Sequence, residues 1–446
     1  MMFPLRTLSL AAAIWAQSVK GAHYTNFLFP DSSEPQPFEL RLDDSFLEMA
    51  LRKVRDYLPT EDFSQEWTLE GPPSERLADV AEYWGTKYDW RSVEERINRD
   101  YHHYATTVPG SGNYTKDIPL HFLHHRSARE DAMPLLLLHG WPSSVLEWSK
   151  VIKPLSEHQD QPFHVVAPDL PGFGFSPAPK QPGLGPREMG EAFDKLMHQL
   201  GYDRYGLVTT DLGWFTGLWM VGDQEDSIIG HMTDFIMLSP TPDDRARLDK
   251  GDVSDEELRY MKAFDHAMNH HMPYFNTHAM KPLAVSQALT DSPVGFLGWC
   301  WDISHAASDG YLYTYEELIT DAMMAWIPGP YANIRGYWEY FKHPYATNYP
   351  QTRVPSAVSE WGFGNGPFPA LADFAFVPEE WAKRIMHNLV FFRRHGAGGH
   401  FPAIAQPELW VQDVREFLYG LDSQQTGIYS AGSPPGEINR QPRDEL

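Results

Sequence analysis

A carboxylate stands where an apolar, strand-like run meets a glycine-rich helix start. The run covers residues 205–210, Asp211 follows it, and Gly213 and Gly217 come next. This is the pattern of a nucleophile elbow, a tight strand-to-helix turn that exposes the nucleophile and aims a backbone N–H at a developing oxyanion. Asp211 is therefore a candidate nucleophile. An aspartate that only caps the following helix would occupy the same position, so this stretch alone leaves both interpretations open.

The second candidate stretch is His139-Gly-Trp-Pro142, which follows four consecutive leucines. A loop directly after a buried strand can donate a backbone N–H to an oxyanion hole, as the corresponding loop does in lipases. The alternative is an ordinary turn built on glycine and proline. The position after a core strand favours the functional interpretation. Another glycine-rich turn, at 169–176, is interpreted as structural support.

A histidine ends the glycine-rich loop at 396–400, after an apolar run at 389–392. His400 on such a loop can lie over the strand ends and act as a general base near neutral pH. It also follows Asp211 in the chain order nucleophile, acid, histidine that this type of sheet uses. Among the 21 tyrosines, Tyr274 and Tyr337 could donate phenol O–H groups to a substrate oxygen, but their local sequence alone does not distinguish them.

Alternating strand-like and helix-like runs predict the fold that must position these residues. After a helical N-terminal stretch, apolar runs and helical patterns alternate up to residue 238. Such alternation indicates an α/β protein whose mostly parallel sheet is covered by helices on both faces. The segment 240–348 breaks the rhythm and is rich in aromatic residues, histidine and methionine, so it is predicted to be a helical lid over the strand ends.

Length and charge exclude several classes of function. The chain has 446 residues, of which 42% are hydrophobic, and it can bury a substantial core. Its 36 basic and 60 acidic residues give a net charge of −24, which argues against a nucleic-acid partner or an anionic membrane surface. Cys300 is the only cysteine, so the chain has no internal disulfide.

Both ends of the chain carry targeting signals. Residues 1–22 contain a short apolar run followed by small residues, which predicts a cleaved signal peptide, with an uncleaved anchor as the weaker alternative. The last four residues, Arg443-Asp-Glu-Leu446, resemble an endoplasmic-reticulum retrieval signal. Asn113 lies in a glycosylation sequon. Together these features predict a glycoprotein of the endoplasmic-reticulum lumen or secretory pathway, and they leave peripheral membrane association open.

The motifs together resemble those of the microsomal-type epoxide hydrolases, a family of the α/β-hydrolase superfamily with an extra N-terminal domain. The likeness runs from residue 37 to about residue 421. It is carried by Trp84-Gly-Thr-Lys-Tyr-Asp-Trp90, His139-Gly-Trp-Pro142, Leu170-Pro-Gly-Phe-Gly-Phe-Ser176, Leu289-Thr-Asp-Ser-Pro-Val-Gly-Phe296 and Gly398-Gly-His400-Phe followed by Gln406-Pro-Glu-Leu.

The terminal signals, the strand and helix patterns and the resemblance together predict a division of the chain into six parts. The expected parts are a signal peptide at 1–22, an N-terminal epoxide-hydrolase-type domain at 35–115, the first half of the hydrolase core at 116–239, the helical lid at 240–348, the second half of the core at 349–422, and a tail at 423–446.

The resemblance also implies roles for individual residues. Asp211 would attack an epoxide carbon while Tyr274 and Tyr337 protonate the epoxide oxygen, which leaves an alkyl ester. His400 would then activate water, and the backbone N–H groups of Trp141 and Leu212 would hold the oxyanion. No metal or organic cofactor is implied. The Trp141–Pro142 peptide bond is expected to be cis.

The family pattern fails at the acid that should orient His400. The acid position falls on Gly364, which has no side chain to supply a carboxylate. Glu360 is the first substitute, and Asp243 and Asp373 are the next. The elbow also departs from the pattern, because Thr209 replaces a small glycine and Leu212 replaces a tryptophan.

Three functions follow in order of preference. The first is an epoxide hydrolase that converts a small lipophilic epoxide into a vicinal diol, since an aromatic-rich lid suits a bulky apolar ligand. The second is a hydrolase-fold isomerase or cyclase of secondary metabolism that opens an epoxide without water, favoured by Gly364 and the altered elbow. The third is an inactive protein that binds a lipophile, which the retained Asp211, His400 and tyrosines argue against. The oligomeric state stays open.

Overall fold

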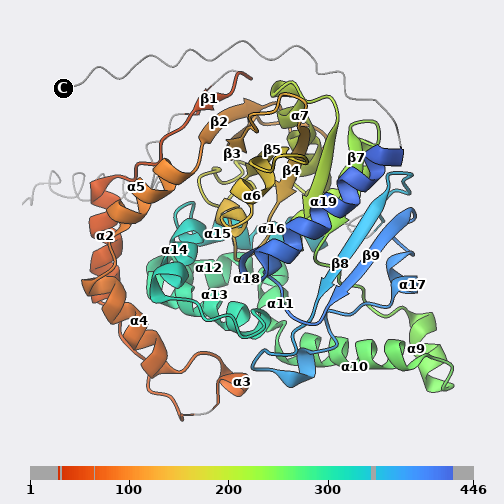
Figure 1. Cartoon of the computed structure of the whole chain (residues 1–446). Helices are drawn as coiled ribbons and strands as arrows, with labels where there is room; N and C mark the ends of the chain where they lie inside the picture. The colour runs from red at the N-terminus through yellow and green to blue at the C-terminus, as the bar shows by residue number, and fades with distance from the viewer. Residues whose placement is uncertain (1–28, 31–32, 65, 343–347, 425–446) are drawn as a thin grey trace, which may run out of the picture.

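The computed structural model describes residues 29–30, 33–64, 66–342 and 348–424. The expected signal peptide and the C-terminal retrieval sequence lie outside these residues. The described chain forms one sheet in the strand order β1-β2-β3-β5-β4-β6-β7-β8-β9, flanked by helices (Figure 1). Within the described residues, no helix is both long and apolar enough to span a bilayer.

The sheet is parallel through its centre and antiparallel at one edge. Neighbouring strands from β5 to β9 pair in parallel, whereas β1, β2 and β3 pair antiparallel and β3 joins β5 in the antiparallel sense. The central strands are buried along their whole length, as expected for strands covered on both faces. The strands are β1 (Gln36–Pro37), β2 (His103–Val108), β3 (Ile118–His125), β4 (Met133–Leu138), β5 (Phe163–Pro168), β6 (Tyr205–Thr209), β7 (Ile228–Thr233), β8 (Ser356–Trp361) and β9 (Leu389–His395).

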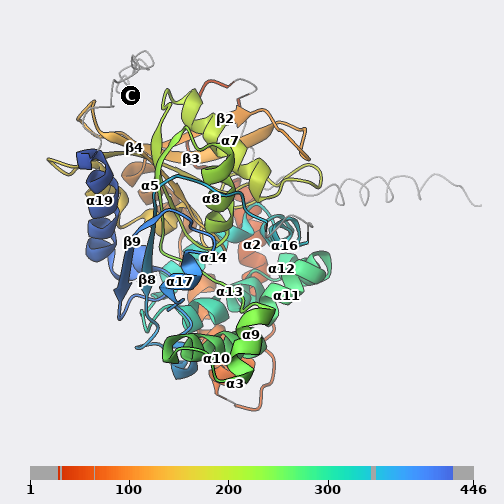
Figure 2. The same ribbon diagram turned by 90° about the vertical axis from the view of Figure 1, so that its right-hand side faces the viewer.

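Helices cover both faces of the central strands. A side chain at Gly206 would meet Leu418 of α19 (Pro407–Gln424), whereas the side chain of Thr209 faces Gly217 of α8 (Asp211–Asp223). Because residues three apart on a strand point to opposite faces, α8 and α19 lie on opposite sides of the sheet. Figure 2 shows α8 beside α7 (Pro186–Gln199), with α19 on the far side of the strands.

Short helical segments complete the core of the fold. They lie in the connections between strands and beside the strand ends that carry the site. They are η1 (Val145–Trp148), α6 (Ile152–Ser156), η2 (Pro369–Leu371), α17 (Glu379–Ala382) and α18 (Pro402–Ala405), where η marks a 3₁₀ turn. The predicted α/β-hydrolase fold, with its mostly parallel sheet and covering helices, is confirmed.

Between β7 and β8 the chain forms a helical layer over the carboxyl ends of the strands. Three of its helices begin with a capping box, in which a Thr or Ser side chain and an acidic residue three positions later satisfy each other's backbone N–H groups. The helices are α9 (Pro242–Asp249), α10 (Asp255–His270), α11 (Pro273–Met280), α12 (Pro282–Asp291), α13 (Pro293–Ala307), α14 (Tyr315–Trp326), α15 (Pro330–Ile334) and α16 (Gly336–Phe341).

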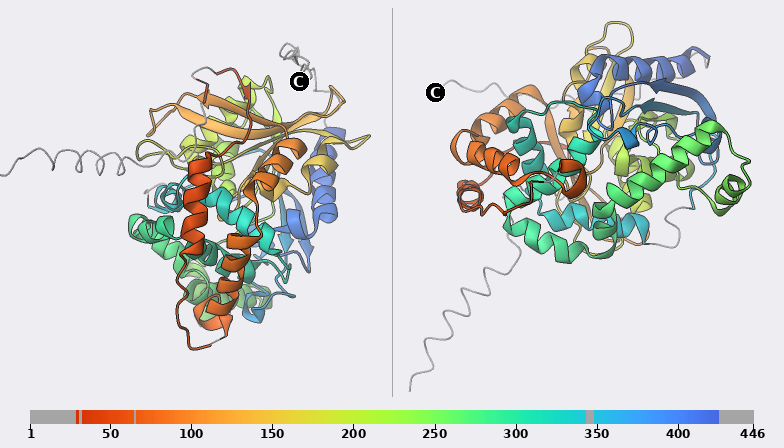
Figure 3. Two further views of the ribbon diagram at one scale, coloured as in Figure 1. Left: turned by 90° about the vertical axis from the view of Figure 1, so that its left-hand side faces the viewer. Right: turned by 90° about the horizontal axis from the view of Figure 1, so that it is seen from below.

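The N-terminal helices pack against this lid from outside (Figures 1 and 3). They are α2 (Asp44–Arg55), α3 (Trp67–Glu70), α4 (Ser74–Thr86) and α5 (Trp90–Asp100). Helices α2 and α4 contact α13, and α4 also contacts α14. The same N-terminal region supplies β1 and β2 to the sheet edge. The N-terminal region therefore contacts both the core sheet and the lid.

Candidate active site

The turn between β6 and α8 has the geometry of an elbow. Asp211 adopts a φ of 44°, a left-handed conformation that is uncommon for a residue with a side chain. The elbow fits only because glycines surround it. A Cβ on Gly140 would lie 2.2 Å from Oδ1 of Asp211, and a Cβ on Gly213 would lie 2.3 Å from the carbonyl oxygen of Leu138. The Asp211 carboxylate is thereby held above the strand ends.

Two backbone N–H groups point at this carboxylate. The N–H of Trp141 donates to Oδ1 of Asp211 at 2.7 Å, and the N–H of Leu212 donates to the same carboxylate. The Trp141–Pro142 bond is cis, which confirms the expectation. His139 fixes the loop, because its ring Nδ1 contacts the carbonyl of Gly140 at 3.0 Å and its Nε2 accepts the N–H of Leu170 at 3.1 Å.

The carboxylate is mostly buried, with 13% of the side chain exposed, and this burial raises the pKa of Asp211 above its ordinary value. His400 and the N–H groups of Trp141 and Leu212 act in the opposite direction, because they favour the charged form. A desolvated carboxylate that keeps a positive potential around it is a stronger nucleophile than one in water. This environment suits attack by Asp211.

His400 lies beside the nucleophile. Its Nε2 atom is 3.6 Å from Oδ2 of Asp211. Burial lowers the pKa of His400, which the neighbouring Asp211 carboxylate opposes. The backbone N–H of His400 donates to the carbonyl of Ala307 in the lid at 2.8 Å, and the ring packs edge-on against Phe235 at 5.0 Å. A neutral imidazole in this position can accept a proton from water.

The two lid tyrosines, Tyr274 and Tyr337, line the same cavity as Asp211. Tyr274 comes from α11 and stacks on the indole of Trp141 at 5.0 Å, and Tyr337 comes from α16 and meets the same indole edge-on at 6.1 Å. Their phenol groups are hydrogen-bonded to each other. Burial raises the pKa of both phenols, so both stay protonated at neutral pH and can donate.

Two buried polar residues that the sequence did not single out hold this aromatic cluster. Asn333 accepts the indole N–H of Trp141 at 3.1 Å and donates to the carbonyl of Ala325 at 2.7 Å. His278 accepts the indole N–H of Trp299 at 2.9 Å, and its ring packs against Trp141 and Tyr337, at 4.8 Å from each. In the sequence, the only feature that links Asn333 to the site is its position four residues before Tyr337.

An apolar cavity opens in front of Asp211. The lid and the strand-end loops supply its wall. The aromatic and aliphatic members of the wall include Leu212, Phe215, Met237, Phe275, Ile303 and Phe374. The polar groups that reach the cavity are few and include Asp211, His400 and the two tyrosines. A lipophilic ligand fits such a cavity.

The structure does not bring Glu360 to His400. Its carboxylate binds Nε of Arg394 at 2.6 Å, and burial raises the pKa of Glu360 to about 8. Glu360 and Arg394 are register partners on β8 and β9, so their side chains share one face of the sheet. The expectation that Glu360 orients the histidine is therefore corrected.

The other two candidate acids, Asp243 and Asp373, also make no contact with the ring nitrogens of His400. Asp243 is exposed in the first turn of α9, and Asp373 lies 3.7 Å from Arg259. Among the described residues, Asp211 is the only carboxylate within 4.0 Å of a His400 ring nitrogen. Gly364 leaves room for a side chain, since an added Cβ would meet only the carbonyl oxygen of Gly396, at 3.7 Å.

Three further acids lie around the site, and the sequence did not mark them. Asp234 follows β7, accepts the indole N–H of Trp410 at 2.6 Å, and has a pKa that burial raises to about 7. Glu147 lies in η1 and is also buried. Asp309 from the lid accepts the backbone N–H groups of Asn365 and Gly398, at 2.7 and 2.8 Å, and so joins the loop of Gly364 to the loop of His400.

The remaining predicted features lie away from the nucleophile. Asp169 accepts hydrogen bonds from the backbone N–H groups of Val145 and Phe175, both at 3.0 Å, and contacts Nδ1 of His121 at 2.7 Å, which fits the predicted structural role of its loop. Asn113 is exposed, and its side-chain amide donates to Glu188 at 2.8 Å. Glycosylation at Asn113 stays a prediction.

The fold and the elbow geometry place the chain among the α/β-hydrolases. Residues 133–275 match the family model described as alpha/beta hydrolase fold, and residues 35–148 match the model described as epoxide hydrolase N terminus. A proposed epoxide hydrolase of Stigmatella aurantiaca is 30% identical over 393 residues, which cover 85% of this chain and 84% of that one. The chain therefore belongs to the microsomal-type epoxide hydrolase family and is an enzyme of that family.

Other relatives span nearly the same region. Epoxide hydrolase 1 of Sus scrofa is 27% identical over 419 residues, with 87% of this chain and 89% of that one covered. The structure of an Aspergillus niger epoxide hydrolase superposes with a TM-score of 0.74 at 27% identity, covering 88% of this chain and 99% of that one. The juvenile hormone epoxide hydrolase of Bombyx mori shares the fold, with a TM-score of 0.72 at 24% identity over 89% of this chain and 96% of that one.

Proposed function

We propose that the protein hydrolyses lipophilic epoxides to vicinal diols through a covalent ester of Asp211. One observation carries the proposal. Oδ1 of Asp211 is held by the N–H of Trp141 at 2.7 Å, while Oδ2 faces His400 at 3.6 Å. One carboxylate thus has an oxyanion donor on one oxygen and a candidate base beside the other.

In the first half of the reaction, an Asp211 oxygen attacks one epoxide carbon and the C–O bond at that carbon breaks. The released oxygen takes a proton from Tyr274 or Tyr337. Both phenols keep their protons at neutral pH because burial raises their pKa values. The product of this half is an alkyl ester of Asp211 with a free hydroxyl on the neighbouring carbon.

In the second half, His400 takes a proton from water, and the water oxygen adds to the carbonyl carbon of the ester. The N–H groups of Trp141 and Leu212 stabilise the negative charge on the carbonyl oxygen. The bond from that carbon to the substrate oxygen then breaks, and the alkoxide takes the proton that His400 holds. The proton of the carboxylic acid so formed returns to the phenolate left by the first half, so the diol leaves with Asp211, His400 and the tyrosine regenerated.

The substrate class follows from the cavity. Its wall is mainly aromatic and aliphatic, which supports a lipophilic epoxide. The relatives include a juvenile hormone epoxide hydrolase of Manduca sexta, 28% identical over 411 residues, whose name gives a lipophilic substrate for that protein. In this chain the cavity specifies apolar bulk rather than one compound.

The targeting features give a location for this activity. We propose that the protein enters the secretory pathway and is retained in the endoplasmic reticulum, on the basis of the N-terminal apolar run and the final Arg-Asp-Glu-Leu. Both segments lie outside the described residues. The exposure of Asn113 supports glycosylation at that site. Glycosidase treatment followed by mass measurement tests the glycan.

A single turnover in ¹⁸O-water with a simple aryl epoxide tests the proposed chemistry. The attacking water adds to the ester carbonyl, so the label is expected on Asp211 and the first diol is expected to be unlabelled. Direct attack of water on the epoxide would instead label the diol and leave Asp211 unlabelled, which would contradict the proposal. The Asp211→Asn variant is expected to form neither ester nor diol.

The missing acid beside His400 favours one second candidate function. An isomerase or cyclase opens the epoxide with a nucleophile inside the substrate and needs no water step. In that case the product would have the mass of the substrate, and no ¹⁸O would enter either the product or Asp211. The same experiment therefore separates the two functions.

A further inference from the structure

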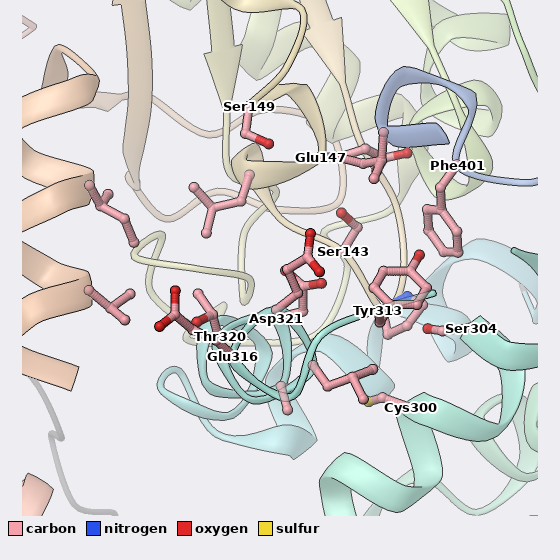
Figure 4. Close-up of a pocket in the computed structure, with 18 of the residues that line it drawn as sticks. Ser143, Glu147, Ser149, Cys300, Ser304, Tyr313, Glu316, Thr320, Asp321 and Phe401 are labelled. Atoms are coloured by element: carbon pink, nitrogen blue, oxygen red, sulfur yellow. The ribbon is translucent and has the colours of Figure 1, made fainter. Parts of the chain in front are cut away.

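A second pocket lies next to the active-site cavity, and Figure 4 shows the residues that line it. Helix α5, the segment after His139-Gly-Trp-Pro142, helices α13 and α14, and the loop after His400 all contribute to its wall. Pro142 and Phe401 line both this pocket and the active-site cavity. The two spaces therefore meet at these two side chains, one next to Trp141 and the other next to His400.

The two spaces differ in chemistry. Hydroxyl and carboxyl groups gather in the second pocket, as Figure 4 shows for Ser143, Ser304, Tyr313, Thr320, Glu147 and Asp321. The active-site cavity has few polar groups beyond the reacting residues. Arg96 and Glu316 lie in the wall of the second pocket and form an ion pair of 2.6 Å. Both side chains are partly exposed, so the pocket opens at the protein surface.

Glu147 gives the strongest indication of an occupant. Its side chain is buried, with 4% of the residue exposed, and it lines the second pocket. The Ser143 hydroxyl is near enough to lower the pKa of Glu147, but neither carboxyl oxygen has a hydrogen-bond partner within 3.5 Å among the described residues. A buried polar group without a hydrogen-bond partner destabilises the fold unless a bound molecule satisfies it. Burial raises the pKa of Glu147 well above its usual range, so Glu147 is mainly a neutral carboxyl group, and burial raises the pKa of Asp321 to about 7.

The lining selects the kind of molecule that fits. Within the described part of the chain, no group of three His, Cys, Asp or Glu residues could hold a metal ion. The basic side chains of the wall are already engaged, since Arg96 pairs with Glu316 and Lys150 donates to Tyr311 and to the carbonyl of Ile404. Hydroxyls and neutral carboxyls both donate and accept hydrogen bonds, as water does.

The proposed reaction needs water at a particular place. Once the ester has formed, the substrate fills the apolar cavity in front of Asp211. Water must then reach the ester carbonyl on the side of His400. Phe401 is the residue next to His400, and beyond it lies the polar pocket.

We propose that the second pocket is the water chamber of the active site: it holds the water for ester hydrolysis on Glu147 and neighbouring polar groups and delivers it past Phe401 to His400. This inference rests on the proposed function. Lipophilic substrate and water then approach Asp211 from different sides of the Pro142–Phe401 wall. The chamber affects the second half of the reaction and leaves the first half unchanged.

Two substitutions on one helix test the separation. Ser304 of α13 lines the second pocket, and Ala306 of the same helix lines the active-site cavity. Ser304→Phe is expected to slow ester hydrolysis about tenfold or more and to leave the alkylation rate within twofold of wild type. The matched control Ala306→Phe is expected to slow alkylation instead. Rapid-quench intact-mass measurement of the ester gives both rates, and circular dichroism checks that each variant is folded.

A second pair of variants tests Glu147 itself. Glu147→Gln keeps a side chain that can hold water and is expected to hydrolyse the ester at close to the wild-type rate. Glu147→Leu removes that capacity and is expected to accumulate the ester. The inference is overturned if Ser304→Phe and Glu147→Leu both hydrolyse the ester at the wild-type rate, or if Ser304→Phe slows alkylation, which would make the pocket a substrate path. Wild-type protein that forms no ester would overturn the proposed function as well.

Discussion

Nε2 of His400 lies 3.6 Å from Oδ2 of Asp211, and no second carboxylate among the described residues lies within 4.0 Å of the same ring. The candidate base therefore stands beside the nucleophile without an acid behind it. An acid in that place orients the imidazole and stabilises its protonated form. Its absence affects the water step more than the alkylation step, because only the water step protonates the histidine.

Replacement of His400 is predicted to separate the two half-reactions. His400→Gln removes the base but leaves Asp211 and the tyrosines in place, so alkylation should continue. Ester hydrolysis should fall by about 10²- to 10⁴-fold, the usual contribution of a general base. Intact-mass measurement should show an adduct that persists on the variant and is transient on wild type. A variant that turns over at the wild-type rate would remove His400 from the mechanism.

Both half-reactions are predicted to lose activity only at acidic pH. Asp211 attacks as a carboxylate, and burial raises its pKa above 3.8, so alkylation is lost as the pH falls through that raised value. His400 acts as a neutral base, and burial lowers its pKa below 6.5, so hydrolysis is lost as the pH falls through that lowered value. Both steps should therefore be pH-independent between pH 7 and 8 in stopped-flow measurements. A hydrolysis rate that already falls between pH 8 and 7 would contradict the burial of His400.

Removal of the hydroxyl group of either lid tyrosine is predicted to slow alkylation. Tyr274→Phe and Tyr337→Phe each delete one donor to the developing alkoxide, and a hydrogen bond to a charged group contributes about 1.5–3 kcal/mol, or roughly 10- to 100-fold in rate. Hydrolysis of an ester already formed should change little. Tyr340→Phe is a suitable control, because this buried tyrosine lies on the same helix and its hydroxyl pairs with Thr216 at 2.8 Å. Equal losses in all three variants would indicate a packing effect.

Local sequence predicts best the positions of the site residues that directly follow strands. Asp211 and Trp141 each follow an apolar strand, and parallel strands bring their carboxyl ends to one edge of the sheet. The sequence could not place Asn333 beside Trp141 or Glu147 at the second pocket, because these contacts join segments far apart in the chain. The phenols of Tyr274 and Tyr337 were assigned only by resemblance to the family.

The assignment of Glu360 failed for a definable reason. Its place near the end of β8 matched the expected region of the acid, but a strand-end position does not say which face the side chain occupies. The parallel register of β8 and β9 sets Glu360 opposite Arg394, and the contact between the two side chains follows from that register. Registers depend on the whole sheet, so they cannot be read from either strand alone.

Restoring an acid at position 364 is predicted to accelerate the water step. Gly364 does not have a positive φ, and a Cβ there meets only the carbonyl oxygen of Gly396 at 3.7 Å, so Gly364→Asp should be accommodated. The loop of Gly364 is tied to the loop of His400 by Asp309, which keeps the new carboxylate close to the histidine. If the lack of an acid limits the reaction, ester hydrolysis should become about tenfold faster, equivalent to about 1.4 kcal/mol.

Two control variants test whether faster ester hydrolysis in Gly364→Asp comes from the new carboxylate. Gly364→Asn has nearly the same shape without the charge and should give no acceleration. Glu360→Gln should leave the pH dependence of hydrolysis unchanged and lower the melting temperature, because it removes the partner of Arg394 rather than of His400. Single-turnover rates of ester decay measure the first comparison, and thermal unfolding measures the second. If Gly364→Asp decays no faster than Gly364→Asn, the water step in this protein does not depend on a third acid, and the polar pocket behind Phe401 becomes the main determinant of its rate.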